Sequence, residues 1–204
     1  MLFGVTPGSI ERMKHYSHTL PKSQNNSLRL FIAVNLSEAV IRNLQNIKKD
    51  MPGLKWGNLT NLHLTMRFIG DTDNKNLKLV ENALELVKEQ AFMVKITGLG
   101  LFNRRAGCVL WAGLESSPEL LGLKKSIDNA LLEKAGLVLE NRAFAPHITL
   151  ARMKTSATPE IKNFVSRVNV QNSFPVDYFI LYKSDLTRVG AIHTPLKTIH
   201  LSGL

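Results

Sequence analysis

The sequence of 204 residues contains one cysteine, Cys108, and no long apolar run. A single cysteine excludes an internal disulfide framework and a zinc site built from several cysteines, and it fits a reducing compartment. We therefore expect a cytoplasmic protein in which Cys108 is a small buried hydrophobic residue. A membrane-spanning helix needs roughly 18 consecutive apolar residues, and no stretch approaches that length, so we expect no membrane segment.

Acidic residues are few relative to basic ones, with 16 Asp and Glu against 26 Lys and Arg and a formal net charge of +10. This balance favours an anionic partner, although it identifies no chemistry by itself. Apolar residues make up 44% of the chain and charged residues 21%, which is typical of a protein with a packed core. The composition therefore excludes a disordered chain.

Residues 1–27 show neither helical nor strand periodicity, and they lack the apolar stretch and cleavage site of a secretory signal. We expect an unstructured N-terminal extension there and a single bilobed domain over residues 28–204.

A hairpin over residues 92–114 and a strand-rich C-terminus favour an α+β fold over a doubly wound parallel sheet. The predicted strands cover residues 29–35, 62–69, 92–102, 108–114, 147–151, 174–184 and 196–201, and the predicted helices cover residues 38–50, 74–90, 118–135 and 159–168, with Ser37, Asp73 and Ser117 as N-cap residues.

A short pattern occurs twice in the chain, as NLHLTM at residues 61–66 and as APHITL at residues 145–150. Each copy reads histidine, aliphatic, threonine, aliphatic, and each lies in a segment with strand periodicity. Side chains two residues apart on a strand point to the same face, so each copy presents an imidazole beside a hydroxyl. The repeat predicts two pseudo-symmetric lobes that face each other across a cleft.

Two facing histidines suit a reaction at phosphorus in which one group removes a proton while another donates one on the opposite side. An imidazole with a reference pKa of about 6.5 serves as base or acid near neutral pH. Threonine hydroxyls donate hydrogen bonds to phosphate oxygens. Zinc needs three or four convergent ligands, which neither copy offers, so we expect no metal and no other cofactor. Chance recurrence of a loose pattern is the alternative that two matched copies disfavour.

The sequence resembles the two-histidine (2H) phosphoesterases, and within them the bacterial and archaeal RNA 2′,3′-cyclic phosphodiesterases, also called 2′-5′ RNA ligases. The resemblance covers residues 28–204 and implies an antiparallel-rich sheet in two lobes, with outer helices around a central cleft. The tyrosine that is usual in this family after a Gly-Ala pair is here His193, a departure at the rim of the cleft. The resemblance depends on RLFIAV at the first strand, Trp56, NLHLTMRFIG, VLWAGL at 109–114, FAPHITLAR at 144–152, and Ser184 to Leu186 with Gly190 and Ala191.

This resemblance implies hydrolysis of RNA 2′,3′-cyclic phosphate ends to 2′-phosphates without a metal, with reversible 2′-5′ RNA ligation as a further capacity. His63 would donate a proton to the leaving 3′ oxygen, and His147 would activate water. The two motifs are nearly symmetric, so this order of roles comes from the family alone. Thr65, Thr149 and Arg152 would bind the phosphate. The expected partner is RNA with a 2′,3′-cyclic phosphate terminus, bound by a monomer.

Several assignments stay open at this point. Strict strand alternation places Arg67 on the His63 face and Arg152 on the face opposite His147, and for each a solvated surface role competes with phosphate binding. Trp111 lies in an apolar strand and is expected in the core, whereas Trp56 fits a core or a base-stacking role equally. Two other functions remain alternatives: a non-catalytic RNA-binding module, and a 2H phosphoesterase that acts on a small cyclic nucleotide.

Overall fold

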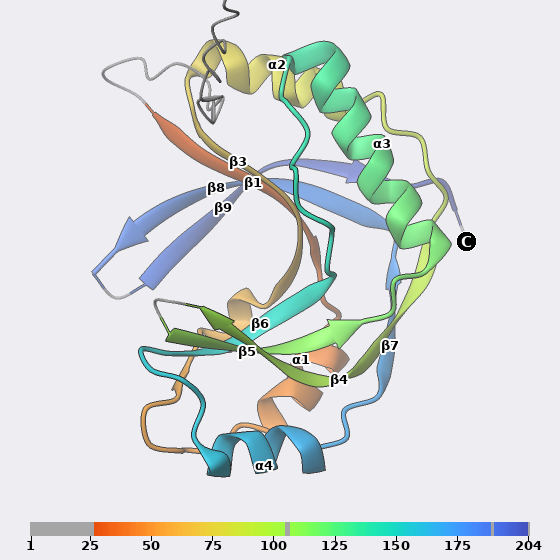
Figure 1. The fold of residues 1–204 in the computed structure, drawn as a ribbon. Helices are drawn as coiled ribbons and strands as arrows, with labels where there is room; N and C mark the ends of the chain where they lie inside the picture. The colour runs from red at the N-terminus through yellow and green to blue at the C-terminus, as the bar shows by residue number, and fades with distance from the viewer. Residues whose placement is uncertain (1–26, 105–106, 189, 204) are drawn as a thin grey trace, which may run out of the picture.

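The computed structural model describes residues 27–104, 107–188 and 190–203. In these ranges nine strands form one sheet with antiparallel pairing between the strands, and four α-helices pack against it (Figure 1). The predicted α+β class is confirmed. The extension predicted over residues 1–27 lies, except for Ser27, outside the described residues, so this division of the chain stays a prediction.

The strands follow one another across the sheet in the order β7-β4-β5-β6-β3-β1-β8-β9, and the short strand β2 pairs with β6. Their bounds are β1 (Leu28–Asn35), β2 (Lys55–Trp56), β3 (His63–Thr72), β4 (Phe92–Arg104), β5 (Gly107–Leu114), β6 (His147–Met153), β7 (Asn172–Val176), β8 (Tyr178–Thr187) and β9 (Gly190–His200). The helices are α1 (Glu38–Asn46), α2 (Asn74–Leu84), α3 (Pro118–Ala135) and α4 (Pro159–Arg167), with a 3-10 turn η1 (Leu59–Asn61) before β3.

The sheet consists of two halves that meet where β3 lies beside β6. These two strands share a single residue pair, Leu64 with Ile148, whereas the neighbouring strands of each half pair over longer stretches. Figure 1 shows the half with β3, β1, β8 and β9 above the half with β6, β5 and β4, with α2 and α3 over the upper half and α1 and α4 below the lower one. The predicted pair of lobes therefore corresponds to two halves of one continuous sheet.

The helices begin at the residues that the sequence predicts. The side chains of Ser37, Asp73 and Ser117 each accept a hydrogen bond from a backbone N–H three residues later, which satisfies a donor that the helix itself leaves unpaired. Thr158 caps α4 in the same way. At the other end of α3, Gly136 adopts a left-handed conformation with φ of 64°, which ends the helix as predicted.

Two helices end earlier than predicted. The predictions were too long because the spacing of apolar residues continues beyond the end of each helix. α1 stops at Asn46 and α2 at Leu84, yet Met51 and Val87 are still buried from the turns that follow. The strand predicted over residues 174–184 is also wrong as one element. It is divided at Asp177 into β7 and β8, which pair with β4 and β1 in opposite halves of the sheet.

The core lies between the sheet and the helices as one continuous cluster of buried apolar side chains. Leu64 and Ile148, at the meeting point of the two halves, are both fully buried. Cys108 is buried too, which confirms its expected role as a small hydrophobic residue. None of the helices in the described ranges is long and apolar enough to cross a membrane.

Candidate active site

The two histidine motifs lie on the strands that join the two halves of the sheet. His63 is the first residue of β3 and His147 is the first residue of β6. The aliphatic residues that follow them, Leu64 and Ile148, pair across the junction and face the core. Since alternate residues on a strand point to opposite faces, both histidines and the threonines two residues later lie on the other face, where all four are half-buried.

Both imidazoles are held by the same backbone contact. Nδ1 of His63 lies 2.8 Å from the carbonyl oxygen of Asn61, and Nδ1 of His147 lies 2.7 Å from that of Ala145. A carbonyl oxygen only accepts hydrogen bonds, so Nδ1 carries the hydrogen in each ring. The proton that each histidine gains or loses near neutral pH is therefore on Nε2.

Aromatic rings surround His147. The ring of Phe102 contacts it edge-on with 4.9 Å between centroids, and the indole of Trp111 lies 6.4 Å away. Trp111 was expected in the core, but it pairs with Thr149 across β5 and β6 and so shares the face of that threonine. The indole crosses β4 at Gly100, where a Cβ atom would lie 2.2 Å from the ring, so glycine provides the room that this orientation needs.

His63 lies in a second aromatic cluster, which includes His193. The His193 ring contacts His63 edge-on at 5.5 Å and Phe31 at 4.8 Å between centroids. Burial is the main cause that lowers the pKa of His63. Its hydrogen bond to Asn61 opposes this effect, whereas the positive charges of His193 and His147 add to it. Burial lowers the pKa of His193 as well. Both rings therefore favour the neutral form in the unliganded protein.

Each motif strand contains an irregularity soon after its threonine, and these irregularities reverse the expected faces of the two arginines. In β3 the register with β1 shifts between the pairs made by Thr65 and Arg67, and in β6 the register with β5 shifts after Thr149. Such a shift inserts an extra residue and interrupts strict alternation. Arg67 is consequently buried at 6% exposure and contacts α3, while Arg152 is exposed and lines a cavity together with His63.

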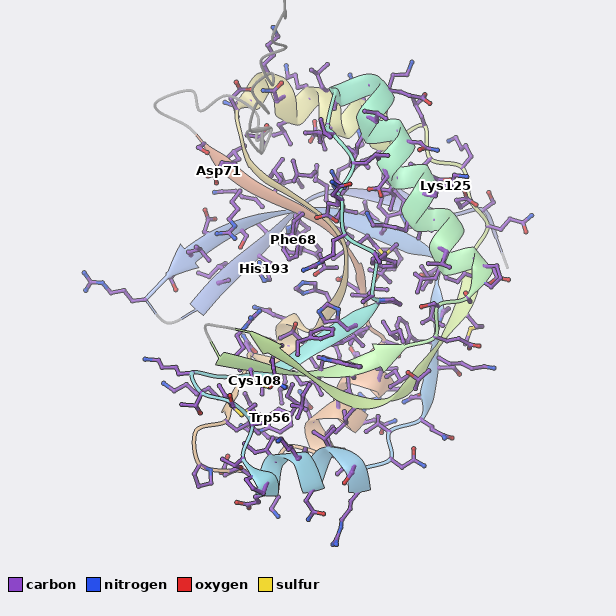
Figure 2. The ribbon with its side chains drawn as sticks, in the orientation of Figure 1. Trp56, Phe68, Asp71, Cys108, Lys125 and His193 are labelled. Atoms are coloured by element: carbon purple, nitrogen blue, oxygen red, sulfur yellow. The ribbon has the colours of Figure 1, made fainter. Side chains whose placement is uncertain are left out.

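Phe68 follows Arg67 and occupies, on its strand, the position that Arg152 occupies on the other, five residues after the histidine. Its side chain is 57% exposed and its ring centroid lies 6.2 Å from that of Phe31. In Figure 2, Phe68 and His193 lie on the half of the sheet that contains β3 and β9. The rim of the site near β3 is thus aromatic.

The main cavity of the site has a volume of about 680 Å³ and lies beside His63. It brings together three residues predicted for the site, His63, Thr149 and Arg152, and it also includes Trp56 and His193. The other two predicted residues, Thr65 and His147, line a hollow of about 40 Å³. In the sequence, His193 stood out only because it replaces a tyrosine that is usual in the family. Its contact with His63 was not predicted.

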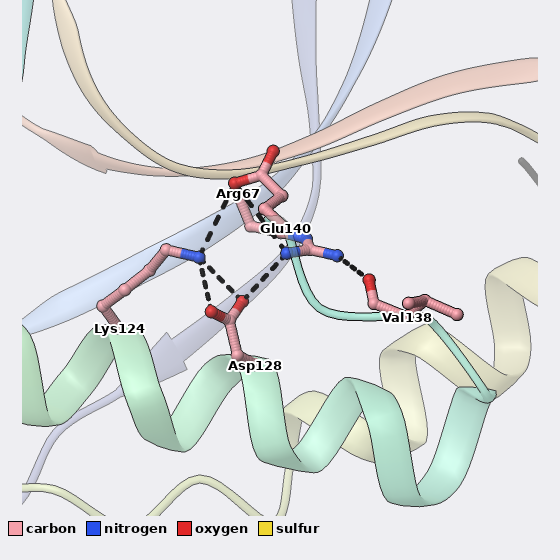
Figure 3. Close-up of polar contacts among 5 residues, drawn as sticks. All are labelled: Arg67, Lys124, Asp128, Val138 and Glu140. Carbon is pink, nitrogen blue, oxygen red and sulfur yellow. Dashed lines mark hydrogen bonds and ion pairs between the residues drawn. The ribbon is translucent and has the colours of Figure 1, made fainter. Parts of the chain in front are cut away.

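Arg67 belongs to a group of charges that we call the ion cluster: Arg67, Lys124, Asp128 and Glu140 (Figure 3). The first three side chains are largely buried, and Glu140 is exposed. Nη1 of Arg67 lies 3.4 Å from Asp128, and Nη2 donates a hydrogen bond of 2.5 Å to the carbonyl oxygen of Val138. The cluster connects β3 to α3 and to the segment that leads into β6. The solvated surface role considered for Arg67 is therefore wrong. Arg67 also lines the hollow of Thr65 and His147, and its role in phosphate binding stays a prediction.

No group of three or more histidine, cysteine or acidic side chains is placed to hold a metal ion among the residues that the structure describes. The polar side chains of the main cavity include imidazoles, hydroxyls, amides and a guanidinium, which suit proton transfer and the binding of an anion.

Comparisons with known proteins agree with this arrangement. The model of the 2'-5' RNA ligase superfamily matches residues 36–188. The chain belongs to this superfamily. The RNA 2',3'-cyclic phosphodiesterase of Archaeoglobus fulgidus is 30% identical over 176 residues, which cover 83% of this chain and 98% of that protein. The protein of the same description from Methanothermobacter thermautotrophicus is 30% identical over 185 residues, with 85% and 99% coverage.

A solved structure of the superfamily has the same fold. The crystal structure of E. coli LigT complexed with 3'-AMP superposes with a TM-score of 0.72 at 26% identity, and the match covers 86% of this chain and 99% of that one. The family expected from the resemblance over residues 28–204 is confirmed, and so is the prediction that the chain is an enzyme.

The ion cluster generates a test of stability. Lys124→Met removes the ammonium group that contacts both carboxylate oxygens of Asp128, at 2.8 and 2.6 Å, and leaves buried negative charge with less compensation. We expect a loss of about 2 to 3 kcal/mol in the free energy of unfolding, measured by urea denaturation. Lys125→Met, at the exposed neighbouring position, is the matched control and should change stability by less than about 0.5 kcal/mol. Equal stabilities for the two variants would contradict a stabilising role of the cluster.

The surroundings of His63 generate a test of its protonation. In an NMR titration of the protein with nitrogen-labelled histidine, we expect His63 to titrate below the unperturbed value of about 6.5. His193→Gln removes a neighbouring imidazole whose protonated form opposes protonation of His63, so the titration of His63 should move to higher pH. His200→Gln, at an exposed position on β9, serves as the control. A His63 titration that stays in place in His193→Gln would show that the two rings do not interact.

Proposed function

We propose that the chain hydrolyses RNA 2′,3′-cyclic phosphate ends to 2′-phosphates by acid-base catalysis shared between His63 and His147, without a metal ion. The observation that carries this proposal is the matched setting of the two imidazoles, each fixed through Nδ1 by the carbonyl two residues earlier. Support comes from relatives named RNA 2',3'-cyclic phosphodiesterase and from the structure of LigT, which was solved as a complex with 3'-AMP. An RNA-binding module without activity has no need for two histidines held in one tautomer.

The reaction divides between the two rings. His147 accepts a proton at Nε2 from the water that attacks phosphorus, and His63 donates the proton of its own Nε2 to the 3′ oxygen. The bond between phosphorus and the 3′ oxygen breaks, and the product carries a 2′-phosphate and a 3′ hydroxyl. A 5′ hydroxyl of a second RNA in place of water gives a 2′-5′ linkage, so ligation is part of the proposal. The order of acid and base follows the family resemblance.

The phosphate is bound by hydroxyls and one guanidinium in this proposal. Thr65 and Thr149 donate hydrogen bonds to the non-bridging oxygens, and each stands two residues after a histidine on the same face of its strand. Arg152 contributes a charge-assisted contact from the main cavity. These contacts stabilise the negative charge that develops on the phosphate oxygens in the transition state.

The lowered pKa of His63 has a consequence for its role as the acid. In the unliganded protein burial favours the neutral ring, which has no proton to donate from Nε2. A bound cyclic phosphate carries a negative charge, and an opposite charge within a few ångströms raises the pKa of an imidazole. Substrate binding therefore restores the protonated form of His63 at the site where the proton is used.

The activity is tested with an RNA that ends in a 2′,3′-cyclic phosphate, incubated with excess EDTA. We expect conversion to a 2′-phosphate, identified by mass and by its resistance to an enzyme specific for 3′-phosphates. His63→Ala and His147→Ala should each lower kcat by at least about 100-fold, because each removes a general acid or base. His200→Ala, which replaces an exposed histidine outside the cleft, is the matched control. Loss of activity in EDTA, restored by zinc or manganese, would refute the metal-independent mechanism.

The acid-base mechanism is tested by pH. The profile of kcat/KM should be bell-shaped, with two limbs that belong to the pair of histidines and not to either residue. The protonated form of His193 opposes protonation of His63, so His193→Gln should displace the bell to higher pH on at least one limb. A profile with a single limb would contradict catalysis by an acid and a base, and a bell that stays in place in His193→Gln would show that neither limb depends on His63.

A further inference from the structure

A second cavity, of about 420 Å³, lies next to the main one and is unusually basic. Three of its lining side chains are cations, Lys55, Arg152 and Lys154, and the other lining residues are Gly107, Cys108, Val109 and Met153. Arg152 lines both cavities, so the two lie side by side at this residue. In Figure 2, Trp56 marks the main cavity and Cys108 the second, on the same half of the sheet.

The backbone places two of these cations directly opposite each other. β2 pairs with β6 so that Lys55 faces Arg152, and like charges in such a pair destabilise a sheet. Lys154 follows at the end of β6. In the described ranges no carboxylate lies within ion-pair distance of any of the three. No described carboxylate therefore compensates this repulsion by an ion pair, and an anionic ligand would relieve it.

A third cavity, which His63 also lines, contains no such cations among its described residues. It has a volume of about 220 Å³ and is lined by Phe31, Tyr182 and His193, with other apolar and uncharged residues. A nucleobase or ribose suits this aromatic side, whereas a phosphodiester suits the basic side. The charges of the cleft thus define the direction in which a polyanionic chain leaves the reaction centre.

We propose that Lys55 and Lys154, together with Arg152, bind the phosphodiester that precedes the terminal nucleotide of the RNA, and that an oligonucleotide is therefore a better substrate than a mononucleotide. The inference rests on the proposed function and specifies its substrate class. A strand whose terminal cyclic phosphate lies beside His63 continues past Arg152 into the second cavity. The floor of that cavity is the apolar surface of Cys108, Val109 and Met153, which strengthens the attraction between the cations and a phosphate.

The experiment compares kcat/KM for adenosine 2′,3′-cyclic phosphate with kcat/KM for a trinucleotide that ends in the same group. The test variant is Lys55→Gln with Lys154→Gln. The control is Lys125→Gln with Lys162→Gln, which removes the same net charge from exposed positions on α3 and α4. Arg152 is left intact because it also lines the main cavity. We expect wild type to prefer the trinucleotide, and the test variant to lower the ratio of the two kcat/KM values by about tenfold. The control should keep the wild-type ratio.

Salt gives a second measurement. Binding of a fluorescent single-stranded RNA should weaken with salt, and the test variant should reduce the slope of log affinity against log salt by about 0.7 for each phosphate that the protein no longer neutralises.

Equal turnover of both substrates by wild type, or an unchanged ratio in the test variant, would overturn the inference and favour a small cyclic nucleotide. If wild type turns over neither substrate, the proposed function fails. In that case, weaker RNA binding by the test variant than by the control supports the inference, and equal RNA binding by the two variants overturns it.

Discussion

The two halves of the sheet are joined by one pair of fully buried aliphatic residues, Leu64 and Ile148. Each is flanked on its strand by a histidine and a threonine, so the pairing that closes the core also sets the faces of both motifs. A slip by one residue would turn the histidines into the core and the aliphatic side chains into the cleft. The cost of burying two imidazoles and exposing two aliphatic residues therefore fixes the register. The packing of Leu64 and Ile148 in the core therefore fixes the positions of the histidines and threonines in the cleft.

The ion cluster connects β3 to the segment of chain that precedes β6, so it also affects the position of the second histidine motif. Arg67 holds the carbonyl of Val138 and lies near Glu140, and the same segment then reaches Ala145, whose carbonyl orients His147. The position of one imidazole is thus connected to the strand that carries the other. Burying the charges of Arg67, Lys124 and Asp128 is expensive, and it is tolerated here because the two cations contact Asp128 and the more exposed Glu140.

Local features of the fold could be predicted from the sequence, whereas features that depend on a partner strand could not. Helix caps such as Asp73, and the shared face of His63 and Thr65, follow from a few neighbouring residues. The shifts in register that exchange the faces of Arg67 and Arg152 depend on how β1 and β5 pair, and no local pattern records them. Trp111 was misplaced for a related reason, since its strand is apolar on both faces and gives no alternation to interpret.

The matched irregularities in β3 and β6 bring corresponding positions to the two rims of the cleft, but the side chains there differ. Phe68 stands on one rim and Arg152 on the other, while the histidines five residues earlier are held by the same backbone contact. That shared contact gives the two imidazoles no preferred direction of proton transfer across a phosphate. In the mechanism that we propose, the unequal rims supply one, because a phosphodiester suits a rim that carries Arg152 better than a rim that carries Phe68. In that proposal, the polarity of the bound strand depends on two residues that take no part in proton transfer.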